Sequence, residues 1–292
     1  MAAMETPSFL FNFKGCYFAS DMITPEYLET IEDFEVRDSD IFVVTYPKSG
    51  TVWIRNIMLL IMYEGQRNGT ENYTNQVLAI DYNITNKDFT QLPSPRIITA
   101  HLPYDLVPKG LKNKKGKVIY VYRNPKDAMV SLFYYFKELG LPEDLEHLMQ
   151  RFFTGKVLSN SIFDHVKGWY THKDNLNILI ISYEEMIKDL RGVVLKICDF
   201  LGKQLSSQEV DKVAKMASFK YMKTDTRGNC EAEIGQLFKK EKVNHLRKGT
   251  IGDWKNVMTV SQSERFDKVF QEKMKDVPLK FIWDIKEIQD HD

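Results

Sequence analysis

The sequence predicts an α/β protein, a single doubly wound domain with a central parallel sheet flanked by helices. Apolar runs of strand length occupy residues 41–45, 96–101, 117–122 and 176–182. Helical patterns separate these runs, and apolar strands that alternate with helices are typical of a parallel sheet covered on both faces. With 292 residues, of which 43% are hydrophobic, the chain is long enough to bury such a core.

The expected helices follow the strands in order along the chain. Pro125 fits the first turn of the second helix, where its missing N–H leaves no hydrogen bond unmade. Ser261 and Glu264 have the spacing of a capping box at the start of the last helix. We expect helices at residues 52–66, 125–139, 161–172, 183–202, 208–216 and 261–275.

The chain shows no internal repeat and no linker rich in Pro, Gly or Ser. We therefore expect one domain over residues 1–292, with an irregular lid or substrate segment at about 224–249. In such a domain, ligands bind beyond the carboxyl ends of the parallel strands. The residues that follow each predicted strand are thus the first candidates for a functional site.

The composition excludes several classes of protein. The 40 basic and 40 acidic residues cancel, so the overall charge does not indicate nucleic-acid binding. The longest apolar run, residues 57–62, is too short to span a membrane, so no membrane association is expected. The cysteines are three and lack C-x-x-C spacing, which favours a reducing cytoplasm over a disulfide framework or a cysteine zinc site.

Residues 41–53, IFVVTYPKSGTVW, have the pattern of an anion-binding loop. A buried strand runs into a turn containing Lys48, Ser49, Gly50 and Thr51, and a helix begins directly afterwards. Backbone N–H groups of such a turn and of the helix N-terminus point toward one anion. The G-x-x-x-x-G-K-[ST] spacing of nucleotide-binding loops is absent from the chain. The pattern indicates a phosphate or sulfate site, although an ordinary turn with a surface lysine would share its shortest part.

Two further segments carry cations in positions suited to an anion. In VYRNPKDAMVSLFYYF, residues 121–136, Arg123 ends a strand and Ser131 lies one to two turns inside the next helix. An arginine binds phosphate bidentately, and a serine hydroxyl can complete the site. In LRKGTIGDWK, Arg247, Lys248 and Gly249 combine two cations with a permissive backbone. A surface arginine before an amphipathic helix is the alternative for the first of these segments.

His101 follows the second predicted strand, in TAHLPYDLVPK. A lone histidine after a strand can have a structural role. An imidazole with an ordinary pKa near ~6.5 can also accept a proton at neutral pH. His101 is therefore a candidate general base.

Taken together, these strings closely resemble the motifs of the cytosolic sulfotransferases. YPKSGTVW is similar to the family's P-loop-like 5′-phosphosulfate-binding loop, usually YPKSGTTW, with Val52 in place of threonine. RNPKD-x-x-x-S, RKG-x-x-GDWK and HLP after a strand also match the family. The resemblance implies transfer of a sulfuryl group from 3′-phosphoadenylyl sulfate (PAPS), with adenosine 3′,5′-bisphosphate (PAP) released. It implies no metal.

The resemblance also implies which residues bind PAPS. Trp53 and Phe219 would flank the adenine, and Tyr183 would contact its polar edge. The stretch ASFKYM departs from the family because Ala217 lacks the usual threonine hydroxyl. The implied set is Lys48, Ser49, Gly50, Thr51, Val52, Trp53, Arg123, Ser131, Tyr183, Ala217, Ser218, Phe219, Met222, Arg247, Lys248 and Gly249.

The implied catalytic residues are His101, Lys48 and Ser131. His101 would act as general base, Lys48 would stabilise the leaving phosphate, and Ser131 would hydrogen-bond Lys48 before the acceptor arrives. Apolar residues that could shape the acceptor site are Pro47, Tyr135 and Phe238.

The acceptor class stays open between hydroxyl groups and amines. The resemblance implies a small apolar phenol, steroid, alcohol or arylamine, as in xenobiotic and hormone metabolism. Many family members have lysine two residues before the histidine, where this chain has Thr99. SPRIITAHLPY, KVIYVYRNPKD and MKDVPLKFIWDI look like the amine sulfotransferase subgroup. A nucleotide kinase and a non-catalytic nucleotide-binding module are the alternative functions.

Residues 255–264, KNVMTVSQSE, fit the K-x-x-x-T-V-x-x-x-E segment through which members of this family form small homodimer contacts. The resemblance therefore implies a weak homodimer. An ordinary loop that enters a capped helix would have a similar pattern, and the two readings are compatible.

Overall fold

A computed structural model of the protein describes residues 7–66, 77–82, 88–141, 143–231, 235 and 246–289. Its centre is a five-stranded parallel sheet in the order β4-β5-β3-β6-β7. The strands are β3 (Ile41–Thr45), β4 (Val77–Ala79), β5 (Ile97–Ala100), β6 (Lys117–Tyr122) and β7 (Ile178–Ser182). The predicted α/β class and doubly wound parallel sheet are confirmed, and the short strand β4 adds to the four that the sequence predicts.

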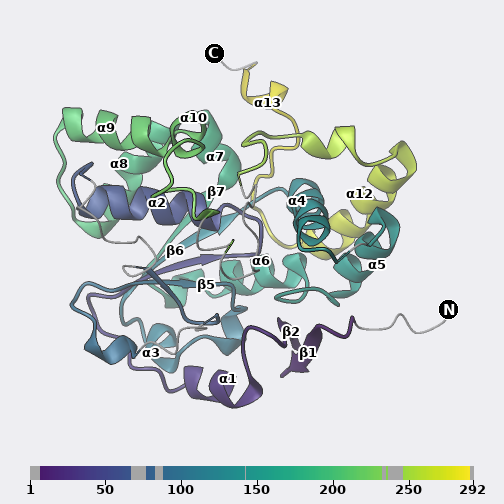
Figure 1. Ribbon diagram of the computed structural model, residues 1–292, viewed down its shortest axis with the longest axis horizontal. Helices are drawn as coiled ribbons and strands as arrows, with labels where there is room; N and C mark the ends of the chain where they lie inside the picture. Colours follow the sequence, from purple (N-terminus) through teal and green to yellow (C-terminus); the bar gives the residue numbers. More distant parts are fainter. Residues whose placement is uncertain are drawn as a thin grey trace.

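Helices cover both faces of this sheet (Figure 1). Side chains alternate along each strand, so Val43, Ile119 and Ile181 belong to one apolar core and Phe42, Val44 and Tyr120 to the other. The first core is closed by α2 (Thr51–Met62), α7 (Tyr183–Lys188), α8 (Leu190–Leu201), α9 (Ser207–Ala217) and α10 (Phe219–Met222).

The second core is closed by the hairpin of β1 (Leu10–Phe13) and β2 (Cys16–Ala19) and by a larger set of helices. These are α1 (Pro25–Ile31), α3 (Lys109–Lys112), α4 (Pro125–Glu138), α5 (Leu145–Thr154), α6 (Ile162–Thr171) and α12 (Val260–Met274). The chain ends beyond α13 (Lys286–Gln289). Among the described residues, no helix combines the length and apolarity needed to cross a membrane.

Two helix predictions require correction. The expected helix 183–202 is two helices, because the Asp189 carboxylate accepts the Gly192 N–H at 2.8 Å and starts α8 anew. The last helix is capped by Thr259 instead of Ser261. Thr259 has extended backbone and forms a capping box with Gln262, whereas Ser261 already lies inside the helix.

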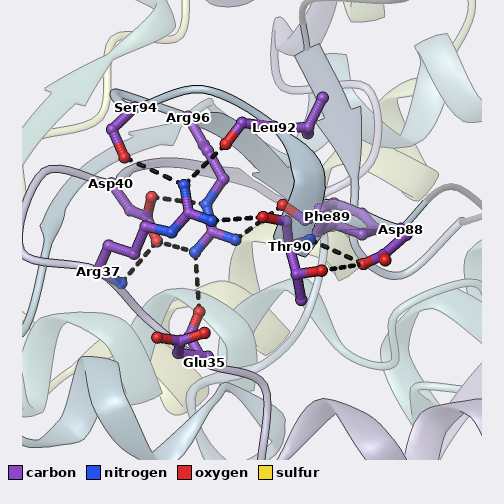
Figure 2. A network of polar contacts seen from close by, with 9 residues as sticks. All are labelled: Glu35, Arg37, Asp40, Asp88, Phe89, Thr90, Leu92, Ser94 and Arg96. Carbon is purple, nitrogen blue, oxygen red and sulfur yellow. Dashed lines mark hydrogen bonds and ion pairs between the residues drawn. The ribbon is translucent and has the colours of Figure 1, made fainter.

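A buried ion pair connects β3 and β5 at their amino ends (Figure 2). The Arg96 guanidinium donates to both carboxylate oxygens of Asp40, at 2.8 and 2.5 Å, and both side chains are almost wholly buried. Arg37 donates to the Leu92 and Thr90 carbonyls and so attaches the preceding loop. A bidentate pair fixes geometry as well as supplying attraction. The network therefore holds the register of these two strands from the end opposite the functional site.

The topology places a switch point at the carboxyl end of β3. The chain leaves β3 toward β4 and β5 on one side and reaches β6 and β7 on the other. Helices on opposite faces of the sheet diverge at such a switch point, and ligands bind there. Val44 pairs with Ala100, and Thr45 pairs with Val121, so the segments after β3, β5 and β6 begin side by side.

Candidate active site

The loop between β3 and α2 has the backbone of an anion site. Its turn is closed by the Ser49 N–H, which donates to the Tyr46 carbonyl at 3.1 Å. Lys48 and Gly50 both have positive φ, at 67° and 101°. A Cβ on Gly50 would lie 2.9 Å from the Tyr183 ring, so only glycine fits without movement. Since Gly50 offers no side-chain cap, the first N–H groups of α2 stay available to an anion.

Two orphaned polar atoms lie in this part of the protein. The Ser49 hydroxyl is completely buried and has no hydrogen-bond partner among the described residues. The Nε of Arg123, in a side chain only 9% exposed, also lacks one there. Buried polar groups are normally hydrogen-bonded, and unpaired ones call for an explanation. Both are donors, so the residues present fit an anionic phosphate or sulfate group.

Lys48 is less strongly charged than an ordinary surface lysine. Desolvation and the nearby Arg123 guanidinium lower the pKa of Lys48 to about 7. Its ammonium lies 4.3 Å from the centre of the Tyr135 ring on α4, and in this structure no Lys48–Ser131 hydrogen bond forms. Lys48 is therefore only partly charged at neutral pH, and a bound anion would favour its charged form.

The structure brings the three cationic segments together. Arg123 Nη1 donates to the Lys48 carbonyl at 3.0 Å, and Nη2 lies 3.4 Å from the Thr250 carbonyl. Its guanidinium also stacks on the Tyr183 ring, 4.1 Å from the ring centre. A strand end, a helix-capping loop and a segment more than 120 residues away thus meet at one arginine.

Two acidic residues, to which the sequence motifs gave no role, hold the segment 247–249 in place. Arg247 and Lys248 both pair with the buried Asp253 carboxylate. The buried Asp127, in the first turn of α4, accepts the N–H groups of Gly252 and Trp254 at 2.7 and 3.0 Å. The two Asp127 contacts join residues 125 and 127 positions apart in the chain, so no local sequence pattern could have indicated them.

The residues expected around the adenine form three contacts with one another and with the segment 247–249. The Trp53 ring meets the Tyr183 ring edge-on, with centroids 5.3 Å apart. Its Nε1–H donates to the Ala217 carbonyl at 2.7 Å, a backbone contact that needs no hydroxyl at position 217. Phe219 packs directly on Gly249, where any Cβ would clash with its ring.

The neighbours of these aromatic residues have structural contacts of their own. Ser218 caps α10 and donates to the Lys215 carbonyl, and Met222 is buried in the first core. Val52 packs partly buried against the same core. Of the predicted adenine-binding residues, Trp53 and Tyr183 thus lie next to the loop of Lys48, whereas Phe219 lies on Gly249.

His101 is held in one orientation and one tautomer. Its Nδ1 lies 2.7 Å from the Thr45 carbonyl oxygen, which can only accept, so Nδ1 carries the proton. In the neutral ring Nε2 then has a free electron pair. The Thr45 hydroxyl contacts both Nδ1, at 3.2 Å, and the Thr51 hydroxyl, at 2.7 Å. The anion loop and the imidazole thus belong to one hydrogen-bonded unit.

Two residues that the sequence did not place in the site, His165 and Asp81, form hydrogen bonds with the backbone of His101. Burial lowers the pKa of His165 to about 3, so its Nε2–H donates to the His101 carbonyl and its Nδ1 accepts from Tyr120. Asp81, two residues beyond β4, accepts the His101 N–H at 2.5 Å. His165 is buried and has both ring nitrogens engaged, so of these two imidazoles only that of His101 has a ring nitrogen without a partner among the described residues.

Of the predicted acceptor-site residues, Pro47 is buried beside Lys48 and Tyr135 is half-buried under its ammonium. Phe238 lies outside the described residues, as does most of the predicted lid between 232 and 245. No group of three or more His, Cys, Asp or Glu side chains suited to a metal ion occurs in the described part of the chain.

The fold and the site define a class of protein. An anion loop at the switch point of a parallel sheet, with a histidine on the neighbouring strand, is the arrangement of a transferase that uses an anionic donor.

Comparisons with known proteins specify the class further. Residues 38–278 match the Sulfotransferase domain family. The rabbit (Oryctolagus cuniculus) amine sulfotransferase is 49% identical over 96% of this chain and 95% of its own length. The guinea-pig (Cavia porcellus) 3-alpha-hydroxysteroid sulfotransferase is 40% identical over 93% of this chain and 97% of its own length. Mouse sulfotransferase SULT7A1, solved in complex with PAP, superposes with a TM-score of 0.77 at 33% identity, covering 92% and 96% of the two chains.

The chain therefore belongs to the sulfotransferase family. It is a PAPS-dependent enzyme that transfers a sulfuryl group to small acceptors, as the sequence motifs predict. The predictions of family, enzyme class and donor are confirmed.

Proposed function

We propose that this sulfotransferase modifies the amine or hydroxyl of a small apolar acceptor, with His101 as general base and Lys48 at the leaving phosphate. The single observation that carries the proposal is the Thr45 contact set. Thr45 connects the His101 ring to Thr51 at the start of α2, so the proton acceptor and the anion loop are fixed relative to each other. Such fixed geometry is what positions reacting groups for transfer.

When bound, PAPS supplies the sulfuryl group and PAP departs. The chain's own residues then have separable tasks. His101 Nε2 takes the proton that the attacking atom must lose. Lys48 and the N–H groups at the start of α2 stabilise the negative charge that grows on the leaving phosphate. Arg123, Ser131 and the 247–249 segment would hold the 3′-phosphate, with Asp127 and Asp253 positioning that segment.

A transfer assay tests this function directly. Purified protein with radiolabelled PAPS and a panel of phenols, steroids, alcohols and arylamines should give a sulfated product and PAP in equal amounts. Phosphoryl transfer from ATP and magnesium without turnover of PAPS would support the kinase alternative. Tight PAP binding without transfer to any acceptor would support a non-catalytic binding module.

We also propose a homodimer through residues 255–264. This segment runs from the end of the 3-10 helix Asp253–Asn256 into the first turns of α12, and Val260 at its centre is 75% exposed. Behind it, the buried Lys126 ammonium contacts Ser263 at 2.8 Å and Asp267 at 2.7 Å, and lies over the Trp254 ring. A partner surface would thus meet a rigidly supported segment with an exposed apolar side chain.

Val260→Glu should lower the sedimentation mass toward the 34.2 kDa of one chain at concentrations where the wild type forms dimers. The reason is that a second copy would bury Val260 and exclude a charge there. Leu195→Glu is the matched control, since Leu195 is also a large exposed apolar residue, on α8. Equal sedimentation of all three proteins would contradict this contact.

Two coarser features complete the proposal. The site draws on segments from Tyr46 to Trp254, which supports one sulfotransferase domain over residues 1–292; a single cooperative unfolding transition would test it. Cys16, Cys198 and Cys230 are all buried cysteines outside any disulfide, which supports a cytoplasmic location. Imaging of the tagged full chain in cells would test that location.

A further inference from the structure

Asp81 is a buried carboxylate to which the mechanism above assigns no chemistry. Its side chain is 1% exposed, and Oδ2 accepts the His101 N–H at 2.5 Å. Oδ1 is buried as well and has no hydrogen-bond partner in the part of the chain that the structure describes. Leaving a buried charged oxygen unpaired is costly, so a stable protein retains one chiefly where a ligand or a function uses it.

The neighbours of Asp81 do not neutralise it. Burial raises the pKa of Asp81, and His101 opposes this shift. Burial, reinforced by Asp81, raises the pKa of the Cys16 thiol to about 12 and that of Tyr82 well above its ordinary value, so both stay uncharged. The Tyr82 ring packs edge-on against the His101 ring, with centroids 5.8 Å apart. The carboxylate thus lies among neutral groups beside the candidate base.

The strand register explains why Asp81 and His101 are together. Ala79 of β4 pairs with Thr99 of β5, and Asp81 and His101 each come two residues later. The carboxyl ends of parallel strands meet at one edge of the sheet, which is the edge of the functional site. Thr99, on the same strand and two residues before His101, brings no charge to this corner.

We propose that Asp81 is the counter-ion for the ammonium group of the acceptor, and that the nitrogen it binds is the atom that becomes sulfated. The inference rests on the proposed function and narrows its acceptors to amines that are protonated at neutral pH. The Asp81 carboxylate is hydrogen-bonded to the backbone N–H of His101, so an ammonium group bound to it would lie beside the His101 imidazole. A cation is the ligand that compensates an unpaired buried carboxylate.

The proton balance of the reaction agrees with this pair of groups. Forming R–NH–SO₃⁻ from R–NH₃⁺ removes two protons from nitrogen, whereas sulfation of a hydroxyl removes one. The first proton passes to Asp81, because burial makes its carboxylate more basic. The nitrogen lone pair forms the N–S bond while the S–O bond to the 5′-phosphate breaks, and its electron pair leaves with PAP. The second proton passes to His101 Nε2.

The test uses three acceptors that share one ring system: 2-naphthylmethylamine, which is cationic at neutral pH, and 2-naphthylamine and 2-naphthol, which are neutral. Asp81→Asn keeps an amide oxygen for the His101 N–H and removes the charge. It should lower kcat/KM for 2-naphthylmethylamine by about 10–100-fold, the usual worth of a hydrogen bond to a charged group. For the two neutral acceptors kcat/KM should stay within about threefold.

Binding provides a second readout that does not depend on turnover. Calorimetry should show 2-naphthylmethylamine binding to the PAP complex of the wild type about 10–100-fold more tightly than to that of Asp81→Asn. Asp174→Asn, at an exposed carboxylate, is the matched control and should match the wild type.

Thr99→Lys tests the same contact by occupying Asp81 instead of removing its charge. It leaves Asp81 intact but offers it a lysine ammonium, so it should reduce amine binding and spare 2-naphthol transfer.

Several outcomes would overturn the proposal. Equal losses for all three acceptors in Asp81→Asn would mean that Asp81 only supports His101. Unchanged amine turnover and binding in both variants would show that no ammonium binds there, and so would a wild type that transfers to 2-naphthol but does not bind the cationic amine. Failure of the wild type to transfer to any acceptor is a different result, because it would overturn the proposed function itself.

Discussion

Replacing His101 with alanine should lower kcat for sulfuryl transfer by about 10²–10⁴-fold, the range that a positioned general base contributes. The affinity for PAP should stay within about threefold, since His101 contacts Thr45 and Asp81 and not the cations of the loop. The measurement is single-turnover transfer to a fixed acceptor, beside calorimetric titration with PAP.

His147→Ala is the matched control for this variant, because His147 is exposed and, among the described residues, its side chain pairs with Asp144 alone. It should transfer at the wild-type rate. Unchanged transfer by His101→Ala would refute the base assignment, although the binding site for the donor would stand. A parallel loss of PAP affinity would mean that the substitution had disturbed the loop through Thr45.

Replacing Lys48 with methionine should slow the chemical step by about 10²–10³-fold, as loss of one donor to a developing charge does. The affinity for PAP should fall much less, because the N–H groups at the start of α2, the Ser49 hydroxyl and Arg123 Nε would remain available to the anion. Methionine retains the length and apolar packing over Tyr135 without the charge. Equal losses in rate and affinity would argue against a role specific to the transition state.

The lowered pKa of Lys48 also predicts how the affinity for PAP depends on pH, and Lys48→Met tests that prediction. At a pKa of about 7 the free protein carries Lys48 charged in about half of its molecules at pH 7 and in fewer above it. Bound phosphate favours the charged form, so PAP binding should take up protons, and affinity should fall as pH rises above 7. Calorimetry at pH 7.5 in buffers of different ionisation enthalpy measures this uptake. Its persistence in Lys48→Met would assign it to another group.

The sequence and the structure agree best where secondary structure is local. The buried strands Ile41–Thr45 and Lys117–Tyr122 have the predicted bounds, because continuous apolar runs between turn residues are a strong signal. The strand Val77–Ala79 has only three residues, too few for a periodic pattern, and depends on pairing with β5. The capping box at Thr259 was misplaced by two residues, since neighbouring serine and threonine residues offer the same spacing.

The residues of the site also fall into two groups, those that linear motifs reveal and those that only the folded chain brings together. Lys48, Arg123, His101 and Arg247 could be named from linear motifs, since short segments hold the residues that such chemistry needs. Asp81 and His165 could not, because they contact His101 across 20 and 64 residues of chain and have no motif of their own. The pKa of Lys48 is likewise a product of burial and of Arg123.

By itself, the sequence determined the class of fold through its apolar periodicity and the anion loop through the residues of one turn, and it indicated the donor and the family through motifs that resemble those of the sulfotransferases. Only the tertiary structure decided which groups surround the reacting atoms. It placed the unpaired Asp81 oxygen beside His101 through the pairing of β4 with β5, and it lowered the pKa of Lys48 by enclosing it with Arg123. Desolvation and charge proximity depend on distances between segments remote in sequence, and those distances exist only in the folded chain.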